Sequence, residues 1–191
     1  MDIEAKREMR REILAARRAM PEAERAAAGP AIRDAVAALP ELGMGGTVAA
    51  YFSVGTEPDT HRLVTTLWKR GTYVLLPVVM PDRSLDWAAY EGPDSLAPAG
   101  HGLLEPTGHR YGPDAVRTAA AVICPALAVD RAGRRLGRGA GCYDRALARV
   151  GPNTLTLAVI YDTELVASVP AEEHDLAVRA VVTPGRGVVR C

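Results

Sequence analysis

The chain has 191 residues, of which 48% are hydrophobic and 24% are charged, a balance that is typical of a globular protein. It excludes a disordered or fibrous chain. Lysine plus arginine number 23 and aspartate plus glutamate also number 23, so the formal net charge is zero. A zero charge argues against general nucleic-acid or membrane-surface binding, because such binding requires a basic excess.

No apolar run approaches the ~20 residues that a membrane helix requires. The N-terminal sequence mixes charged and apolar residues, unlike the unbroken apolar core of a signal peptide. The three cysteines are odd in number and form no C-x-x-C pair, which argues against a disulfide framework or a cysteine metal site. We therefore expect a cytoplasmic protein with free thiols, one domain spanning residues 1–191, and no obligate protein partner.

The secondary-structure elements are predicted from hydrophobic spacing and from the positions of glycine and proline. In chain order they are a long helix over 3–28 with Pro21 as its only interruption, a helix over 30–39, a strand over 47–52, a helix over 59–70, strands over 73–79 and 85–90, an irregular segment over 92–113, a strand over 119–129 interrupted at Pro125, a helix over 142–150, and strands over 155–161 and 180–183. Helices that alternate with apolar strands predict a layered α/β domain with a mainly parallel sheet flanked by helices.

A glycine-rich segment carries the clearest local signal for a binding site. Gly137, Gly139 and Gly141 alternate between a predicted strand and a predicted helix, so backbone N–H groups can approach an anion closely. Arg135 and Arg138 add positive charge. We interpret this segment as a phosphate-binding loop, although it contains no Walker A motif and a solvated Arg/Gly turn is the alternative.

Asp144 falls in the first turn of the helix that follows this loop. An acidic residue there commonly does no more than stabilise the helix dipole, a contribution of ~0.3–1 kcal/mol. The alternative is a Mg²⁺ ligand, because Mg²⁺ on nucleotide phosphates is held by one or two carboxylates and by water. The residues alone favour the first role, and a bound nucleotide would favour the second.

The long N-terminal helix places basic residues on its apolar side. At about 100° per residue, Lys6, Arg10 and Arg17 fall within the stripe of apolar side chains, whereas Arg7 falls outside it. The first three side chains should therefore point toward the body of the protein. Buried charges require partners, which here are either an internal carboxylate or a bound phosphate.

Glu57 follows the first predicted strand and precedes the next helix. In parallel α/β sheets, ligands bind beyond the carboxyl ends of the strands. Asp59 or Thr60 suits the N-cap of that helix, which leaves Glu57 available to bind substrate.

Taken together, these segments resemble the 5-formyltetrahydrofolate cyclo-ligase family, also called methenyltetrahydrofolate synthetase. The matching landmarks, in order, are 6–10 (K-x-x-x-R), 51–60 (Y, E and D-T), 76–77 (L-P), 105–106 (E-P), 124–130 with 135–144 (the R-L-G-x-G-x-G-Y-Y-D signature), 170–175 (P-x-E-x-H-D) and 181–183 (V-V-T). Ala126, Val129 and Cys142 depart from the central signature, in which Cys142 replaces a tyrosine.

The resemblance implies that the protein uses ATP and Mg²⁺ to convert 5-formyltetrahydrofolate to 5,10-methenyltetrahydrofolate, with release of ADP and phosphate. The residues implied to bind ATP are Lys6, Arg10, Arg135, Leu136, Gly137, Arg138, Gly139, Ala140, Gly141, Cys142 and Tyr143. Those implied to bind the folate are Phe52, Glu57, Arg138, Gly139, Ala140, Gly141 and Cys142. Lys6 and Arg138 are implied to be catalytic. Asp144 is implied to hold Mg²⁺, while Arg179 stands where some relatives carry a second acidic ligand.

Two alternatives remain at this point. A sugar-phosphate isomerase of similar α/β architecture would need a base beside the phosphate loop and no ATP. An arginine-rich nucleic-acid-binding module would need a basic face, which the zero net charge disfavours.

Overall fold

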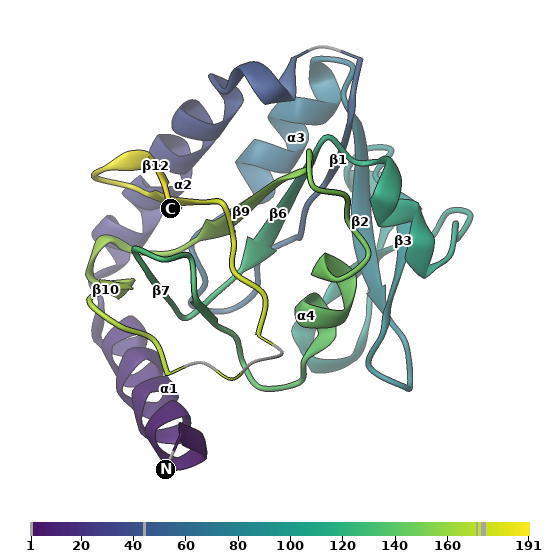
Figure 1. The fold of residues 1–191 in the computed structure, drawn as a ribbon. Helices are drawn as coiled ribbons and strands as arrows, with labels where there is room; N and C mark the ends of the chain where they lie inside the picture. The colour runs from purple at the N-terminus through teal and green to yellow at the C-terminus, as the bar shows by residue number, and fades with distance from the viewer. Residues whose placement is uncertain (1, 44, 171, 173–174) are drawn as a thin grey trace.

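The computed structural model describes residues 2–43, 45–170, 172 and 175–191, and its centre is a seven-stranded sheet (Figure 1). The strand order is β12-β11-β9-β6-β1-β2-β3. The strands are β1 (Thr47–Ala49), β2 (Tyr73–Val79), β3 (Leu85–Ala89), β6 (Ala121–Pro125), β9 (Leu155–Val159), β11 (Ala180–Thr183) and β12 (Gly187–Arg190). The two edge pairs are antiparallel and the inner pairs are parallel. The predicted mainly parallel α/β fold is confirmed.

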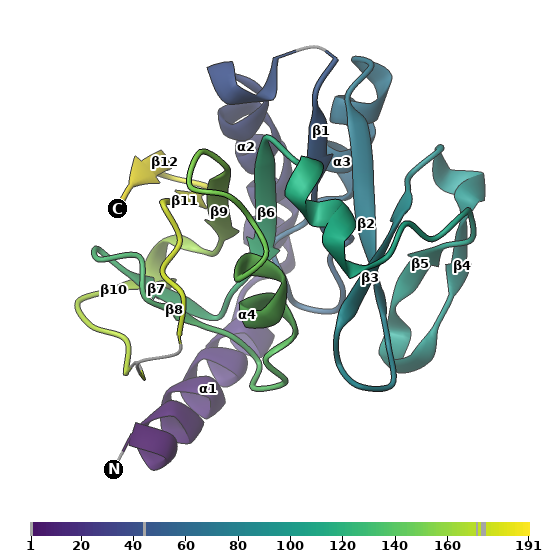
Figure 2. The same cartoon turned by 45° about the vertical axis from the view of Figure 1, so that its right-hand side comes forward.

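Both faces of the sheet are covered, which explains why its strands are apolar along their length. Helices α2 (Glu22–Ala37) and α3 (His61–Lys69) pack on one face, where Ile32 and Leu63 meet Val48. Helix α4 (Cys142–Leu147) and the 3₁₀ helix η4 (Pro113–Thr118) lie on the other face, against Ala49 and Val122 (Figure 2). Because side chains alternate along a strand, Val48 and Ala49 serve opposite cores.

The N-terminal helices differ from the prediction of helices over 3–28 and 30–39. Helix α1 spans Asp2–Ala19 and α2 begins at Glu22, because Pro21 has an extended ψ of 141° that interrupts the helical path. Pro30 does not open a helix but lies inside α2. The neighbouring Gly29 is buried, and a Cβ at its position would lie 2.7 Å from Asp59 Oδ2, so α2 passes close to Asp59 at this point.

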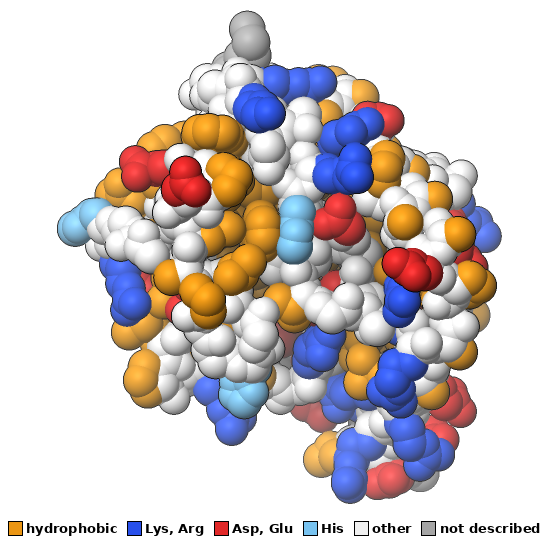
Figure 3. All heavy atoms as spheres, turned by 180° about the vertical axis from the view of Figure 1, so that it is seen from behind, with side chains coloured by type: hydrophobic (Ala, Val, Ile, Leu, Met, Phe, Trp, Pro, Cys, Tyr) orange, Lys and Arg blue, Asp and Glu red, His pale blue; other side chains and the backbone are white. Residues whose placement is uncertain are grey.

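Helix α1 packs outside the main sheet, on a small sheet with the order β10-β7-β8. These strands are β7 (Ala128–Asp130), β8 (Arg135–Leu136) and β10 (Leu165–Val166). Met9, Ile13 and Leu14 of the helix contact Leu127 and Leu136 there. The molecular surface carries scattered basic and acidic side chains (Figure 3). On the exposed side of α1, Arg7 and Glu4 form such a pair.

Several further boundaries differ from the prediction. The strand predicted over 119–129 is two strands, β6 and β7, which separate after Pro125 and enter different sheets. The segment 92–113 contains a short hairpin of β4 (Leu96–Pro98) and β5 (Leu104–Pro106). Strand β12 follows the strand that we expected to be the last. The helices and several strands also end earlier than predicted, as their bounds show.

None of the helices in the described part of the chain combines the length and the apolar character needed to cross a membrane.

Candidate functional site

A cavity of about 670 Å³ opens beyond the carboxyl ends of β1, β2 and β6, where Phe52, Val79 and Pro125 line it. Every residue that the sequence analysis assigned to a site lines this cavity: Lys6, Arg10, Phe52, Glu57, Arg135, Leu136, Gly137, Arg138, Gly139, Ala140, Gly141, Cys142, Tyr143 and Asp144. This is the expected place for a ligand in a parallel α/β sheet. The structure therefore brings together residues that lie far apart in the sequence.

The glycine loop connects β8 to α4 and forms one side of the cavity. Gly139 has a φ of 103° and Gly141 a φ of 70°, values that favour glycine over residues with a side chain. Arg10 Nε donates a hydrogen bond to the carbonyl of Gly137 over 2.9 Å. Helix α1 thus holds the loop directly, and the guanidinium of Arg10 also lies within 3.6 Å of the position of a Cβ on Gly139.

The other basic residues at the cavity are paired with carboxylates. Lys6 Nζ lies 2.7 Å from Asp175 Oδ2 and 3.7 Å from Glu172 Oε1. Arg135 Nη2 lies 2.7 Å from Asp144 Oδ1. Within each pair the positive and negative charges compensate each other. A phosphate that enters the cavity would have to compete with the carboxylates for Lys6 and Arg135.

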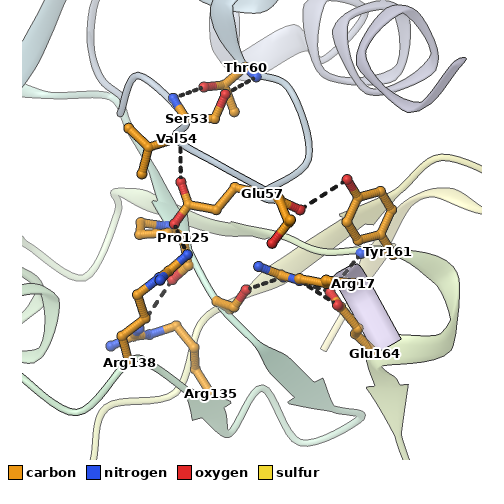
Figure 4. Close-up of polar contacts among 12 residues, drawn as sticks. Arg17, Ser53, Val54, Glu57, Thr60, Pro125, Arg135, Arg138, Tyr161 and Glu164 are labelled. Atoms are coloured by element: carbon orange, nitrogen blue, oxygen red, sulfur yellow. Dashed lines mark hydrogen bonds and ion pairs between the residues drawn. The ribbon is translucent and has the colours of Figure 1, made fainter. Parts of the chain in front are cut away.

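Arg138 and Glu57 form the third such pair, with 3.3 Å between Arg138 Nη2 and Glu57 Oε1 (Figure 4). The Arg138 side chain is 52% exposed, whereas that of Glu57 is 8% exposed. The buried carboxylate is also held by its own loop, because Val54 N donates to Glu57 Oε2 over 2.9 Å. The pair connects the glycine loop to the segment between β1 and α3.

The segment between β1 and α3 is fixed by hydrogen bonds between Ser53 and Thr60 (Figure 4). Each backbone N–H donates to the other residue's hydroxyl over 3.0 Å, and Thr60 Oγ1 donates to the carbonyl of Tyr51 over 2.7 Å. Phe52 stacks on His61 with 3.7 Å between ring centroids. The position of Phe52 at the cavity is therefore set by α3 as well as by the segment that follows β1.

Arg17 points inward as expected, but its partner is an internal carboxylate beneath the cavity. The residue is 1% exposed, and its Nε and Nη2 atoms donate to the two carboxylate oxygens of Glu164 over 2.6 and 2.8 Å. Nη2 also donates to the carbonyl of Ala126, which lines the cavity. Burial acts to lower the pKa of Arg17, but the hydrogen bond and charge of Glu164 outweigh burial and raise it.

Sequence reasoning missed one wall of the cavity, which is apolar and consists of Pro77, Val79, Leu85, Leu103 and Leu104. Apart from Pro77, which belongs to the L-P landmark at 76–77, no local motif marks these residues, because strands and a hairpin loop bring them together. Ile3 also lines the cavity although it is 69% exposed. Tyr51, Glu105, Glu172 and Asp175 were likewise not assigned to the site. The last two belong to the landmark at 170–175, of which residues 171, 173 and 174 lie outside the described residues.

Within the described residues, no group of three or more histidine, cysteine, aspartate or glutamate side chains is arranged to hold a metal ion. The carboxylate of Asp144, the residue expected to hold Mg²⁺, lines the cavity and contacts Arg135 through Oδ1, so it could offer a metal one carboxylate. This donor set fits a Mg²⁺ ion whose remaining ligands are phosphate oxygens and water.

Comparison with known proteins identifies the class of this α/β protein. The family model described as the 5-formyltetrahydrofolate cyclo-ligase family matches residues 2–184. The chain belongs to this family, and it is therefore an enzyme, a ligase of folate one-carbon metabolism.

Individual relatives agree with the family match. The chain is 41% identical to the 5-formyltetrahydrofolate cyclo-ligase of Mycolicibacterium smegmatis, over 99% of this chain and 98% of that protein. It is 31% identical to the enzyme of the same name from Escherichia coli K12, over 89% of this chain and 95% of that protein. The solved structure of Aquifex aeolicus 5,10-methenyltetrahydrofolate synthetase is also similar, with a TM-score of 0.82 and 29% identity over 97% of this chain and 92% of that one.

Proposed function

We propose that this single-domain enzyme uses ATP and Mg²⁺ to convert 5-formyltetrahydrofolate to 5,10-methenyltetrahydrofolate, releasing ADP and phosphate. The main support is one observation: a single cavity brings the glycine loop and its basic residues together with Glu57 and Phe52. Family membership favours this reaction over a sugar-phosphate isomerase or a nucleic-acid-binding module. The names of the relatives supply the folate substrate and product.

The chemistry needs activation of an unreactive group. A formamide oxygen is a poor leaving group, and transfer of the γ-phosphate from ATP to that oxygen converts it to a good one. Nitrogen N10 of the folate then attacks the formyl carbon, phosphate leaves with the former formyl oxygen, and N10 loses its proton. This sequence needs positioning and charge neutralisation and does not need a nucleophilic side chain.

The basic residues would supply that neutralisation. We assign Lys6 and Arg138 to the reacting phosphate, because each can leave a carboxylate partner at the cavity for a phosphate oxygen. Arg10 and Arg135 would hold the nucleotide together with residues 136–143 of the glycine loop. The loop needs glycine at the two left-handed positions for its backbone N–H groups to face an anion.

Mg²⁺ would enter with the nucleotide and would be held by Asp144. When bound, it would neutralise phosphate charge. The pairing of Asp144 with Arg135 fixes the carboxylate at the start of α4, beside the glycine loop.

The folate would occupy the other half of the cavity. We place its pterin ring against Phe52 and Glu57, because a ring can stack on Phe52 and the buried carboxylate can accept hydrogen bonds from ring N–H groups. Arg138 and residues 139–142 would contact both substrates, because Arg138 reaches Glu57 from the glycine loop and residues 139–142 line the same cavity.

The purified protein should form the methenyl product, detected by its absorbance, when 5-formyltetrahydrofolate, ATP and Mg²⁺ are all present. Omitting ATP should abolish product formation, and ADP and phosphate should appear in a ratio of one to one with product. Product formation without ATP, or no product in the complete mixture, would contradict the proposal.

A further inference from the structure

Glu57 has a counter-charge that the proposed reaction would remove. Arg138 Nη2 lies 3.3 Å from its carboxylate, yet the same guanidinium is assigned to the reacting phosphate. If phosphate draws Arg138 away, a carboxylate that is 8% exposed loses its cation. Losing the cation of a buried carboxylate is costly, so a donor in addition to the Val54 N–H and the pterin N–H groups would stabilise Glu57 at that moment.

Tyr51 supplies a donor of the right kind. It is 4% exposed and lines the same cavity as Glu57. Its hydroxyl oxygen is closed off from solvent and has no hydrogen-bond partner in the described part of the chain, and the same holds for the hydroxyl of Tyr143. Buried hydroxyls are rarely left unpaired, because the unmade hydrogen bond destabilises the protein.

The surroundings of the Tyr51 hydroxyl favour a protonated donor near an anion. Burial raises the pKa of Tyr51 well above its ordinary value, and the charge of Glu57 raises it further. The Tyr51 phenol therefore keeps its proton and can donate to a carboxylate.

We propose that Tyr51 is a positioning residue for Glu57: its hydroxyl takes over the Glu57 carboxylate when the nucleotide phosphate draws the Arg138 guanidinium away. The Glu57 side chain turns toward the Tyr51 hydroxyl, which donates a hydrogen bond to it. This keeps the Glu57 carboxylate directed at the folate in the complex with both substrates. The inference rests on the proposed function. The hydroxyl acts through Glu57, since it is closed off from the solvent side of the cavity.

The test compares wild type with Tyr51→Phe, measuring 5-formyltetrahydrofolate affinity by calorimetry with and without a non-hydrolysable ATP analogue. Without nucleotide, Arg138 stays on Glu57 and the two proteins should bind the folate equally. With the analogue, the variant should bind about tenfold more weakly, the scale of one hydrogen bond to a charged group. Because the ligand-free hydroxyl has no partner to lose, the melting temperature of the free variant should be unchanged or higher.

Thr72→Val is the matched control. Its hydroxyl is also buried and without a partner among the described residues, but it does not line the cavity. The Thr72 variant should bind the folate like wild type under both conditions. A general effect of removing a buried hydroxyl would instead weaken both variants and would overturn the inference.

A double variant tests whether Tyr51 acts through Glu57. In a Glu57→Gln background, Tyr51→Phe should change folate affinity by less than about twofold, because coupled residues are not additive. Full additivity would indicate direct contact with the folate and overturn the positioning role. A tenfold loss that is equal with and without the analogue would overturn it as well. Failure of the wild type to bind the folate would overturn the proposed function itself, and the inference with it.

Discussion

Arg135 and Asp144, at the two ends of the glycine loop, form an ion pair with 2.7 Å between Nη2 and Oδ1. The Arg135 side chain is almost fully buried, and it also donates to the carbonyl of Pro125 at the end of β6. The pair therefore connects the loop to the sheet. It also means that the one carboxylate proposed to hold Mg²⁺ has a structural partner before any nucleotide arrives.

Asp144→Asn separates these two roles. Asparagine preserves the size of the side chain and can still accept a hydrogen bond from Arg135, but it lacks the charge that a hard cation needs. We expect the variant to fold, its turnover to fall by about two orders of magnitude or more, and its remaining activity to need more Mg²⁺. A rate loss of this size is typical when charge stabilisation of a transition state is removed. A Mg²⁺ titration of the initial rate at fixed ATP measures both.

Asp114→Asn is the control for this substitution. Asp114 also pairs with an arginine, Arg149, over 2.7 Å, but it lies on η4 and outside the cavity. Its Mg²⁺ titration should superimpose on that of wild type. If the Mg²⁺ titration of Asp144→Asn also superimposed on that of wild type, Asp144 would have a structural role and would not bind Mg²⁺.

Lys6→Ala should raise the KM for ATP and lower kcat much more than Arg7→Ala. Lys6 reaches the cavity and its carboxylates, whereas Arg7 is exposed and pairs with Glu4 on the same helix. Removing an interaction with a reacting phosphate should reduce kcat/KM by about 10²-fold or more, while loss of an exposed pair changes stability by at most ~1 kcal/mol. Equal and small effects in steady-state kinetics would contradict the assignment of Lys6.

Arg17→Met should destabilise the protein by roughly 3–5 kcal/mol, because it leaves Glu164 buried without its cation. Urea unfolding measures the change in the free energy of unfolding. Adding Glu164→Gln to this variant should recover part of the loss, since the second substitution removes the uncompensated charge. Arg18→Met, at the exposed neighbouring position, should stay within about 0.5 kcal/mol of wild type.

The three cysteines should react with a thiol reagent in a fixed order. Burial raises the pKa of Cys124 to about 11, so at pH 7.5 its thiolate is scarce as well as inaccessible, and it should react only after unfolding. Cys142 lines the cavity, so ATP with 5-formyltetrahydrofolate should slow its labelling, whereas labelling of the exposed Cys191 should not respond. Peptide mass spectrometry distinguishes the three sites. Equal protection of Cys142 and Cys191 would contradict the placement of the ligands.

The sequence alone predicted the α/β class, most of the strands and the residues of the glycine loop. These features are local: apolar runs of strand length identify buried strands, and alternating glycines identify a loop that needs left-handed backbone. Helical spacing in α1 also predicted that Lys6, Arg10 and Arg17 face inward, because side-chain direction on a helix follows from residue number.

The tertiary structure decided which partners those residues meet. Arg17 pairs with Glu164, which lies 147 positions away, and Arg138 pairs with Glu57 across the cavity. Helical spacing predicts the direction in which a side chain points, but it does not predict the group that the side chain contacts. The same limit applies to α2, which continues through Pro30 because packing against the sheet outweighs the local cost of proline. Chain folding brings distant segments together, and the free energy of those contacts exceeds the local preferences that a sequence displays.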